Sequence, residues 1–592
     1  MIEAGRATAG TAGTAGTAGT SVTAGTTGTT GTTGTTGTTT TTPATGRDRL
    51  GLRFEFPDGE LERMAVLGDV TDRSVRVWIR HPGGGTTATL HVDDAEVGRT
   101  AIETAPDHDH VGAAVLEADA PRPGTAFEVR VDGEVRHGTF APSAGTPARV
   151  SFGFGSCHQP FRDGASSGHL ERHPGAGIYP RLADLLTRRQ AAFTLLLGDQ
   201  VYTDAVSRIS VREALGDDPT LTDADLVATY RHLYRGYFNE RGFRRLTEAF
   251  PAYLVWDDHD IFDGWGSLLR TSAFDRRLFR AAETAYLEYQ RLRDPGGSLD
   301  ARAPYDFTVW HGDVAIHALD LRGVRDLDLG RILGDEQWER LDACLRDATD
   351  RGVTTVFVAA SVPVVHASPA IMGLLERWPI GTGRDIRDRW NVPTFRHERT
   401  ALLERLFAWQ AGGRRRQVVI LSGDVHVAAA FGVRPRGGGP RIRQWTSSAL
   451  STPGGLQHVV ANRVLTSLVR LGEPDLDVRR RGIATGNNAG LVEVVPAEGG
   501  GHHLTFTVYQ YDQRRDRLQR AFVDRASPGG RQAARSAVRG VATLTRGALT
   551  GPSAGYIASN VSTTWIADPP PSTGQPLARA TASSSDSALM IE

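Results

Sequence analysis

Residues 191–204, which read AAFTLLLGDQVYTD, join an apolar run to a polar cluster. Three leucines end the apolar run, which has the composition of a buried strand. A glycine follows them, and Asp199, Tyr202 and Asp204 come directly afterwards. Glycine and aspartate are common turn residues, so this stretch alone is compatible with a plain turn. Whether the arrangement recurs along the chain decides between a turn and a site.

Helical and strand patterns alternate on both sides of that stretch. Residues 178–190 have apolar side chains at helical spacing and precede the strand, and 336–352 have the same spacing and precede the apolar run 353–361. Alternation of this kind predicts an α/β fold in which helices cover a sheet. We therefore expect a layered α/β catalytic domain over 149–526.

A different pattern occupies residues 48–148. Short segments of alternating apolar and polar residues, such as SVRVWIRH at 74–81, are separated by turn signals such as Asp132-Gly133. The pattern predicts a small antiparallel β-sandwich of the fibronectin type III or immunoglobulin kind. The Thr/Gly/Ala repeat within 1–47 and the Arg/Gly-rich, then Ser/Pro-rich tail over 527–592 offer little to bury. We expect the first to be disordered and the second to be mobile.

The composition excludes several classes of function. The 67 basic and 68 acidic residues balance, so no general affinity for nucleic acid or an anionic membrane is expected. Every basic residue is arginine, which excludes a Schiff-base lysine and a P-loop lysine. The two cysteines form no disulfide framework, and no stretch approaches the roughly 20 apolar residues of a membrane span. The first residues show no export signal, so the cytoplasm is the expected location.

Polar clusters follow five predicted strands. They comprise Cys157 and His158 in GSCHQ, Asp199 and Tyr202 in GDQVYTD, Asp257, Asp258, His259, Asp260 and Asp263 in DDHDIFDGW, Asp320, Arg322 and Arg325 in LDLRGVRD, and Asp424 and His426 in SGDVH. In layered α/β folds, ligands bind beyond the carboxyl ends of the strands, where such loops converge. Several acidic groups in one cleft would repel one another unless cations were bound there. The clusters therefore predict a metal centre.

The residue types indicate which metals suit that centre. Carboxylates suit hard cations such as Ca²⁺, Mg²⁺ or Mn²⁺. A phenolate and a thiolate suit a more strongly polarising ion, of which ferric iron is the natural choice. Two unlike ions side by side would form the bimetallic clamp of phosphate-ester hydrolysis.

Taken in this order after a β-sandwich, the five motifs resemble the alkaline phosphatase D (PhoD) family of the calcineurin-like metallophosphatase superfamily. The resemblance extends over about 65–510. It implies a four-layer α/β/β/α domain, with Fe³⁺ and Ca²⁺ as cofactors and Mn²⁺, Mg²⁺ or Zn²⁺ as alternatives. It also implies hydrolysis of a small phosphoester by a metal-bound hydroxide.

The resemblance implies metal ligands residue by residue. Four residues would hold the iron-like ion: Cys157, Asp199, Tyr202 and His426. Asp199 would bridge to a second, harder ion held by Asp258 and Asp424. Each position has a plainer alternative, because Cys157 could be a buried thiol and Tyr202 a packing residue.

Two further residues would act on the ester itself. His259 would donate a hydrogen bond or a proton to the ester oxygen. Arg322 would clamp the phosphoryl oxygens, which a guanidinium fork matches in a bidentate manner. The alternative for Arg322 is a structural ion pair with Asp320 or Asp326.

The chain departs from the family pattern after the third strand. Asp260 stands where members often have Glu, and Asp263 stands where they often have Asn. A carboxylate at 263 could recruit another Ca²⁺ or alter its loop. His366, which follows another predicted strand, is a further candidate ligand.

The leading hypothesis is a metal-dependent hydrolase of phosphate monoesters or diesters. The alternative is a non-catalytic surface adhesion or binding protein, in which the β-sandwich is carried on a low-complexity stalk. A third interpretation is a metal-dependent hydrolase of substrates other than phosphate esters. Arg322 and Arg325 disfavour it, because arginine suits the recognition of phosphate.

Overall fold

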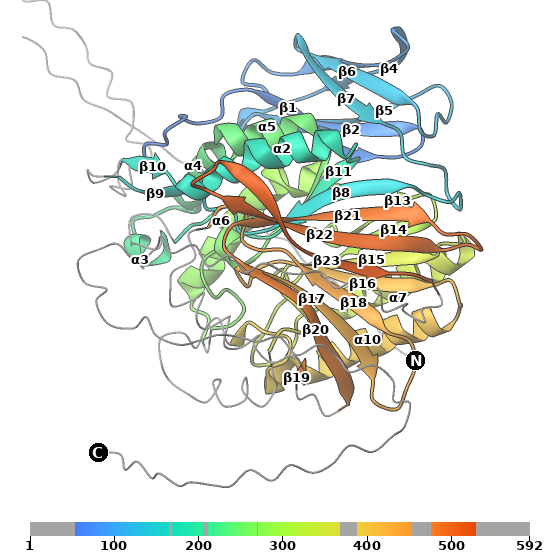
Figure 1. Ribbon diagram of the computed structural model, residues 1–592. Helices are drawn as coiled ribbons and strands as arrows, with labels where there is room; N and C mark the ends of the chain where they lie inside the picture. Colours follow the sequence, from blue (N-terminus) through green and yellow to red (C-terminus); the bar gives the residue numbers. More distant parts are fainter. Residues whose placement is uncertain are drawn as a thin grey trace, which may run out of the picture. The chain divides into compact units, whose positions relative to one another are not determined.

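The computed structural model describes residues 54–164, 169–204, 211–216, 218–268, 270–367, 387–452, 470–471 and 475–528 (Figure 1). These residues belong to one compact unit, Met1–Val538. No helix among them is long and apolar enough to cross a membrane. The predicted disordered segment 1–47 and nearly all of the predicted tail 527–592 lie outside the described residues, so those two expectations stay predictions.

Seven strands form a β-sandwich near the start of the described chain. One antiparallel sheet holds β1 (Met64–Val70), β2 (Ser74–Arg80) and β5 (Val111–Glu117). The other has the order β4 (Ala95–Ile102), β3 (Thr86–Val92), β6 (Ala126–Val131) and β7 (Glu134–Thr139). Apolar side chains such as Val77 and Leu90 meet in a core between the two sheets. The alternating pattern in the sequence therefore predicted this region correctly.

A six-stranded sheet carries the first three site loops. Its order is β12 (Ala252–Val255), β11 (Phe193–Leu197), β8 (Val150–Gly155), β21 (Asn488–Pro496), β22 (His502–Asp512) and β23 (Arg517–Ala526). β8, β11 and β12 are parallel, whereas β21 pairs antiparallel with β8. The three parallel strands therefore end at the same edge. A small sheet of β9 (Phe161–Asp163) and β10 (Leu170–Arg172) lies outside it.

An eight-stranded sheet carries the other two site loops. Its order is β13 (Phe307–His311), β14 (Val314–Ala318), β15 (Thr355–Ala360), β16 (Gln417–Ser422), β18 (Ile442–Thr446), β17 (Val427–Pro435), β20 (Leu476–Thr485) and β19 (Arg470–Leu471). β14, β15, β16 and β18 are parallel, so their carboxyl ends also share one edge.

Three apolar cores separate four layers. Phe152 of one sheet and Phe357 of the other belong to the core between the sheets. Helices α2 (Ile178–Arg188), α4 (Asp223–Phe238), α5 (Arg241–Ala249) and α6 (Ala273–Tyr289) pack on the other face of the six-stranded sheet. Helices α7 (Asp335–Asp350) and α10 (Arg396–Ala411) pack on the eight-stranded sheet. The order α/β/β/α confirms the predicted fold. A further short helix, α3, spans Val211–Leu215.

Burial on both faces explains the run of leucines in strand β11. Leu195 and Leu197 point into the core between the sheets, whereas Leu196 points into the core under the helices. Because successive side chains of a strand face opposite sides, burial on both faces demands a continuous apolar run. The run ends where the strand leaves the two cores, and polar residues begin there.

The β-sandwich is fixed to the helical layer by specific contacts. The indole Nε1 of Trp78 donates a hydrogen bond of 2.7 Å to the carbonyl of Glu288, next to the end of α6. The guanidinium of Arg293 lies 4.0 Å from the centre of the Trp78 ring. A Cβ at Gly68 would lie 2.0 Å from the carbonyl oxygen of Arg293, so only glycine fits this approach.

Candidate active site

The predicted site residues lie in loops at the carboxyl ends of parallel strands. Cys157 follows β8 and Asp199 follows β11, whereas Asp424 and His426 follow β16. All four have left-handed backbone conformations, with φ of 63°, 57°, 62° and 53°. This conformation costs a non-glycine residue of order 1–3 kcal/mol, and such residues concentrate at functional sites. Four of the six predicted metal ligands therefore share this costly backbone conformation.

Hydrogen bonds between loops fix their relative positions. The backbone N–H groups of Cys157 and His158 donate to the carbonyls of Gly198 and Asp199 at 3.1 and 2.8 Å. The Ser156 hydroxyl accepts a 3.0 Å bond from the N–H of Asp424, so a third loop is tied to the first. The two sheets thus contribute to one rigid cluster.

Three predicted ligands meet at one carboxylate oxygen, that of Asp199, and a fourth adjoins the phenol of the group. The Cys157 thiol and the Tyr202 hydroxyl each donate to Oδ2 of Asp199, at 3.2 Å in both cases. Nε2 of His426 lies 3.5 Å from the Tyr202 hydroxyl. Ligand atoms about 2.1 Å from a tetrahedral ion are about 3.4 Å apart, so these separations suit a single cation.

Burial makes this cluster unfavourable without a cation. Burial and the Asp199 carboxylate raise the pKa values of the Cys157 thiol and the Tyr202 hydroxyl well above their ordinary values. Burial raises the pKa of Asp199 to about 6, with a contribution from Asp258. Oδ1 of Asp199 is buried and has no hydrogen-bond partner among the described residues. A bound cation would ionise the thiol and the phenol and would satisfy the orphaned oxygen, so the residues fit a metal.

A second set of oxygen atoms adjoins the first. Carboxylate oxygens of Asp199, Asp257 and Asp258 lie within 4.8 Å of one another. Burial raises the pKa of Asp257 well above its ordinary value, although Arg322 opposes this effect. An all-carboxylate group of this kind suits a hard divalent cation, with Asp199 shared between the two sets.

Arg322 is an internal ion-pair partner, with no exposed surface. Its Nε contacts Asp257, and its Nη2 lies 3.2 Å from Asp258. The other carboxylate is Asp388, which accepts from Nη1 at 2.6 Å and from Nη2 at 2.8 Å. Nη1 also donates to the carbonyl of Trp265 at 3.0 Å. All five N–H donors of a guanidinium are thereby used, so the structure favours the ion-pair alternative for Arg322, with partners other than Asp320 and Asp326.

His259 is held by a carboxylate from a neighbouring loop. Its Nδ1 lies 2.7 Å from Oδ1 of Asp204, and its ring stacks on Tyr202 with 4.2 Å between ring centres. Burial lowers the pKa of His259, but Asp204, Asp199 and Asp258 outweigh it and raise the pKa well above its ordinary value. Ligand atoms of Asp204, His259 and Asp263 also lie within 4.8 Å of one another. Asp263 thus lies beside the site, and its role stays a prediction.

Asp424 contacts an arginine that the sequence did not suggest. Its Oδ2 pairs with Nη1 of Arg389, whose side chain is 13% exposed. Neither of the carboxylate-containing ligand groups found among the described residues includes Asp424. The main-chain carbonyl of Asp424 nevertheless lies 3.6 Å from the Cys157 sulfur, so its loop belongs to the cluster.

Other residues of the motifs have structural surroundings. His158 is buried between Phe243 and Tyr179, and burial lowers its pKa to about 3. Asp260 accepts bonds from the backbone N–H groups of Gln200 and Asp257 and so joins two loops. His366 is buried, and no ligand group among the described residues includes it.

Three residues of the site were not assigned from the sequence. Asp204 stands in the quoted motif, where its carboxylate was the available signal. Asp388 and Arg389 stand in RDIRDRW, a segment of alternating charges that resembles an exposed face. Only their position beside Arg322 and Asp424 reveals their importance.

Residues 164–454 match the family of PhoD-like phosphatases. The chain carries a PhoD-like phosphatase domain. The match includes all the predicted site residues except Cys157, and it identifies this domain as that of a phosphoric ester hydrolase, as the motifs predicted.

The solved structure of PhoD agrees with the fold of that domain. The structure of PhoD aligns with 18% identity over 77% of this chain and 91% of that chain, with a TM-score of 0.52. A purple acid phosphatase, PPD1 of yellow lupin (Lupinus luteus), aligns with 9% identity over 80% of this chain and 75% of its own, with a TM-score of 0.48. No curated protein matches the chain. At this identity the PhoD structure bears on the fold alone.

Proposed function

We propose that this PhoD-like domain hydrolyses small phosphate monoesters or diesters at a centre for two unlike metal ions. The observation that carries the proposal is the convergence of a thiol and a phenol on one carboxylate oxygen, that of Asp199. Ions bound there would polarise the phosphoryl group and lower the pKa of an attacking water molecule. The remaining steps fall to side chains of the chain itself.

Two groups of side chains would hold the ions. Cys157, Asp199, Tyr202 and His426 form the mixed sulfur, oxygen and nitrogen set. Asp199 and Asp258 form the hard set, and Asp424 would join it if Arg389 released its carboxylate. Ferric iron suits the first set because a phenol and a thiol must both ionise, and Ca²⁺ suits the second, with Mn²⁺, Mg²⁺ or Zn²⁺ as alternatives.

His259 would carry the proton for the leaving group. Its Nδ1–H is committed to Asp204, which leaves Nε2 for an ester oxygen. The three carboxylates around the ring favour the protonated form that a general acid needs. Asp204 would act as a positioning residue, because it touches His259 and orients it.

Arg389 is the better candidate for the phosphoryl oxygens than Arg322. Arg322 is buried and has all its donors engaged, so it would instead hold Asp257 and Asp258 in place. Arg389 is partly exposed, and its ion pair within the described part of the chain joins Nη1 to Asp424. If a metal ion took over the Asp424 carboxylate, the guanidinium of Arg389 would be available for an oxyanion beside that ion.

The test combines metal analysis with turnover. We expect purified full-length protein to contain two kinds of metal and to hydrolyse p-nitrophenyl phosphate, bis-p-nitrophenyl phosphate or both. Arg389→Ala should raise KM, whereas Arg322→Ala should lower metal content and stability. Metal-free protein that hydrolyses neither ester after addition of Fe³⁺, Ca²⁺ or Mn²⁺ would contradict the proposal.

The two other functions have weaker support. A non-catalytic binding protein gives no reason for four strained ligand positions around a buried carboxylate. A hydrolase of non-phosphate substrates leaves the partly exposed guanidinium of Arg389 beside the metal ligands unexplained.

A further inference from the structure

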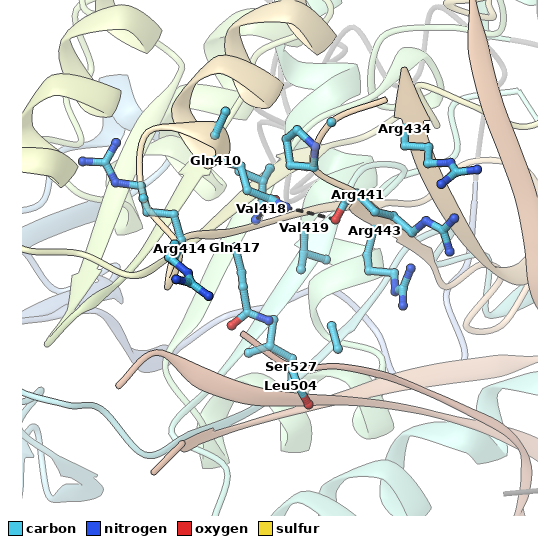
Figure 2. Close-up of a pocket in the computed structure, with 16 residues that line it drawn as sticks. Gln410, Arg414, Gln417, Val418, Val419, Arg434, Arg441, Arg443, Leu504 and Ser527 are labelled. Atoms are coloured by element: carbon cyan, nitrogen blue, oxygen red, sulfur yellow. Dashed lines mark hydrogen bonds between the residues drawn. The ribbon is translucent and has the colours of Figure 1, made fainter. Parts of the chain in front are cut away.

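A pocket lies at the opposite end of strand β16 from the candidate active site. It has a volume of about 670 Å³ and is lined by the first residues of β16, the last residues of α10, and parts of β17 and β18 (Figure 2). Leu504 of β22 and Ala526 of β23 complete its wall, so both large sheets contribute. It shares no residue with the active site.

The lining is strongly basic. Five of the sixteen lining residues are arginine, and none is Asp or Glu: Arg414, Arg416, Arg434, Arg441 and Arg443. The whole chain has 67 arginines against 68 acidic residues among 592, so this segregation of charge is not a consequence of composition.

Few carboxylates compensate these arginines. Asp477 lies 2.8 Å from Arg434, 3.2 Å from Arg479 and 3.9 Å from Arg441. Asp524 lies 2.6 Å from Arg481 and 3.3 Å from Arg443. Two carboxylates therefore serve five guanidinium groups in this part of the described chain. Arg441 reflects this imbalance, because burial and the neighbouring Arg434 and Arg479 lower its pKa.

Arg443 is the buried member of the group, with only 5% of its surface exposed. Its Nη1 has no hydrogen-bond partner among the described residues. Burial lowers its pKa to about 10, and Arg481 and Arg441 add to that effect against the attraction of Asp524. A buried cation with an unused donor is costly unless an anion approaches it.

Arg416 has a separate structural role. Its Nη1 donates to the carbonyl of Trp409 at 3.2 Å, and its guanidinium lies 4.8 Å from the centre of the Trp409 ring. It therefore compensates the negative end of α10, which would otherwise repel an anion. Arg414 and Arg441 stay available at the rim.

The geometry points to a second ligand site in this pocket, for a small anion that carries several phosphate groups. Guanidinium groups bind phosphate oxygens in a bidentate manner, and several of them around one concave surface match a chain of phosphates better than a single phosphate. The volume lies in the usual range for small-molecule sites, about 300–1,000 Å³, and exceeds what orthophosphate fills. The site is independent of the proposed function.

The experiment measures binding of a methylene-bridged, non-hydrolysable triphosphate to the full-length, metal-loaded protein by isothermal titration calorimetry. The pocket variant is Arg414→Ala with Arg441→Ala. The matched control is Arg302→Ala with Arg515→Ala, which removes the same number of arginines, both exposed and both paired with carboxylates outside the pocket. We expect the pocket variant to lose about 100-fold in affinity for one equivalent of ligand, roughly tenfold per charge-assisted bond, and the control to lose none.

A second readout locates the ligand. Phenylglyoxal modifies accessible guanidinium groups, so bound triphosphate should protect Arg414 and Arg441 from modification and leave Arg302 reactive. Tighter binding of the corresponding ATP analogue would assign the site to a nucleotide, and equal binding would assign it to an inorganic oligophosphate. Orthophosphate that binds as tightly as the triphosphate would overturn the proposal.

Three more outcomes would also overturn it: identical titrations of wild type and pocket variant, equal losses in pocket variant and control, or binding of duplex DNA through Arg414 and Arg441 without binding of any small anion. Turnover of p-nitrophenyl phosphate, measured in the same samples, should be equal in the wild type and the pocket variant. Absence of turnover in every sample would count against the proposed function and leave the binding result intact.

Discussion

The two ends of strand β16 concentrate ionisable groups of opposite charge. At its carboxyl end, Asp424 and His426 join a group of buried acids, and burial raises the pKa of Asp199 to about 6. At its amino end, β16 begins beside a group of arginines, and burial lowers the pKa of Arg443 to about 10. Only six residues, about 20 Å of strand, separate the two ends.

An excess of buried charge of one sign indicates the charge of the ligand that each end of β16 would bind. Each end concentrates groups of one sign in a place where burial penalises the charged form. The carboxyl end would be completed by cations, since its donors include a thiol and a phenol as well as carboxylates. The amino end has guanidinium donors alone and would be completed by an anion. Substitutions that disrupt one end of β16 should therefore leave the other end intact.

The largest effect is expected for Asp199→Asn. Asp199 is shared by both predicted metal sets, so the variant should lose both ions and all measurable phosphatase activity. Metal analysis and turnover of p-nitrophenyl phosphate check this outcome, with Asp326→Asn as a control on the half-buried loop after Arg325. A fully active variant would contradict the assignment of Asp199 as the shared ligand.

The same substitution should stabilise the metal-free protein. A carboxyl whose pKa is raised on folding lowers stability once the pH exceeds its ordinary pKa of about 3.9. Metal-free wild type should therefore lose stability as the pH rises from about 4 to 6, and Asp199→Asn should lose less. Thermal unfolding in the presence of a chelator measures the difference. When metal is restored, the difference should reverse sign, because the wild type binds the metal and the variant does not.

A second large effect is expected for Asp388→Ala. Burial opposes ionisation, but Arg322 and Arg325 outweigh it and hold the pKa of Asp388 well below its usual range. Removing one partner of a buried ion pair typically costs about 3–5 kcal/mol in the free energy of unfolding. Urea denaturation checks this value, and Asp328→Asn on the exposed part of the Arg325 loop is the control, expected within about 0.5 kcal/mol of wild type.

The sequence predicted the layers and the loops that carry the candidate ligands, because both follow local rules. A continuous apolar run such as Leu195, Leu196 and Leu197 predicts a strand that is buried on both faces. The polar residue after such a strand predicts a loop at the sheet edge. Arg322 was expected at that edge, as a clamp or as an ion-pair partner, but its partner Asp388 could not be identified because it is 66 residues away in sequence. Ion pairs between distant segments leave no periodic signal, and the amino-end arginines were missed for the same reason.

An intermediate effect is expected for His259→Ala and a smaller one for Asp204→Asn. Loss of a general acid typically slows turnover about 10²–10⁴-fold, and both variants should keep their metals. Asp204 is the first of the three carboxylates that raise the pKa of His259. Its removal should lower that pKa, so the pH above which activity falls should move downward. An unchanged pH profile with normal metal content would show that Asp204 does not position His259.

The smallest effect is expected at the amino end, for Arg441→Gln. Arg441 is partly exposed, and its ion pair among the residues that the structure describes is a long one, 3.9 Å from Asp477. The free energy of unfolding should therefore change by no more than about 0.5 kcal/mol. Its neighbours Arg434 and Arg479 repel it, and salt screens such repulsion over about 10 Å at 0.1 M. Raising the salt concentration should therefore stabilise wild type more than Arg441→Gln, while turnover and metal content stay equal in both. Thermal unfolding at low and high salt measures this difference. An identical salt response would mean that the arginines are already compensated and that the two ends of β16 are not opposites, because only the carboxyl end would then carry charge that awaits a partner.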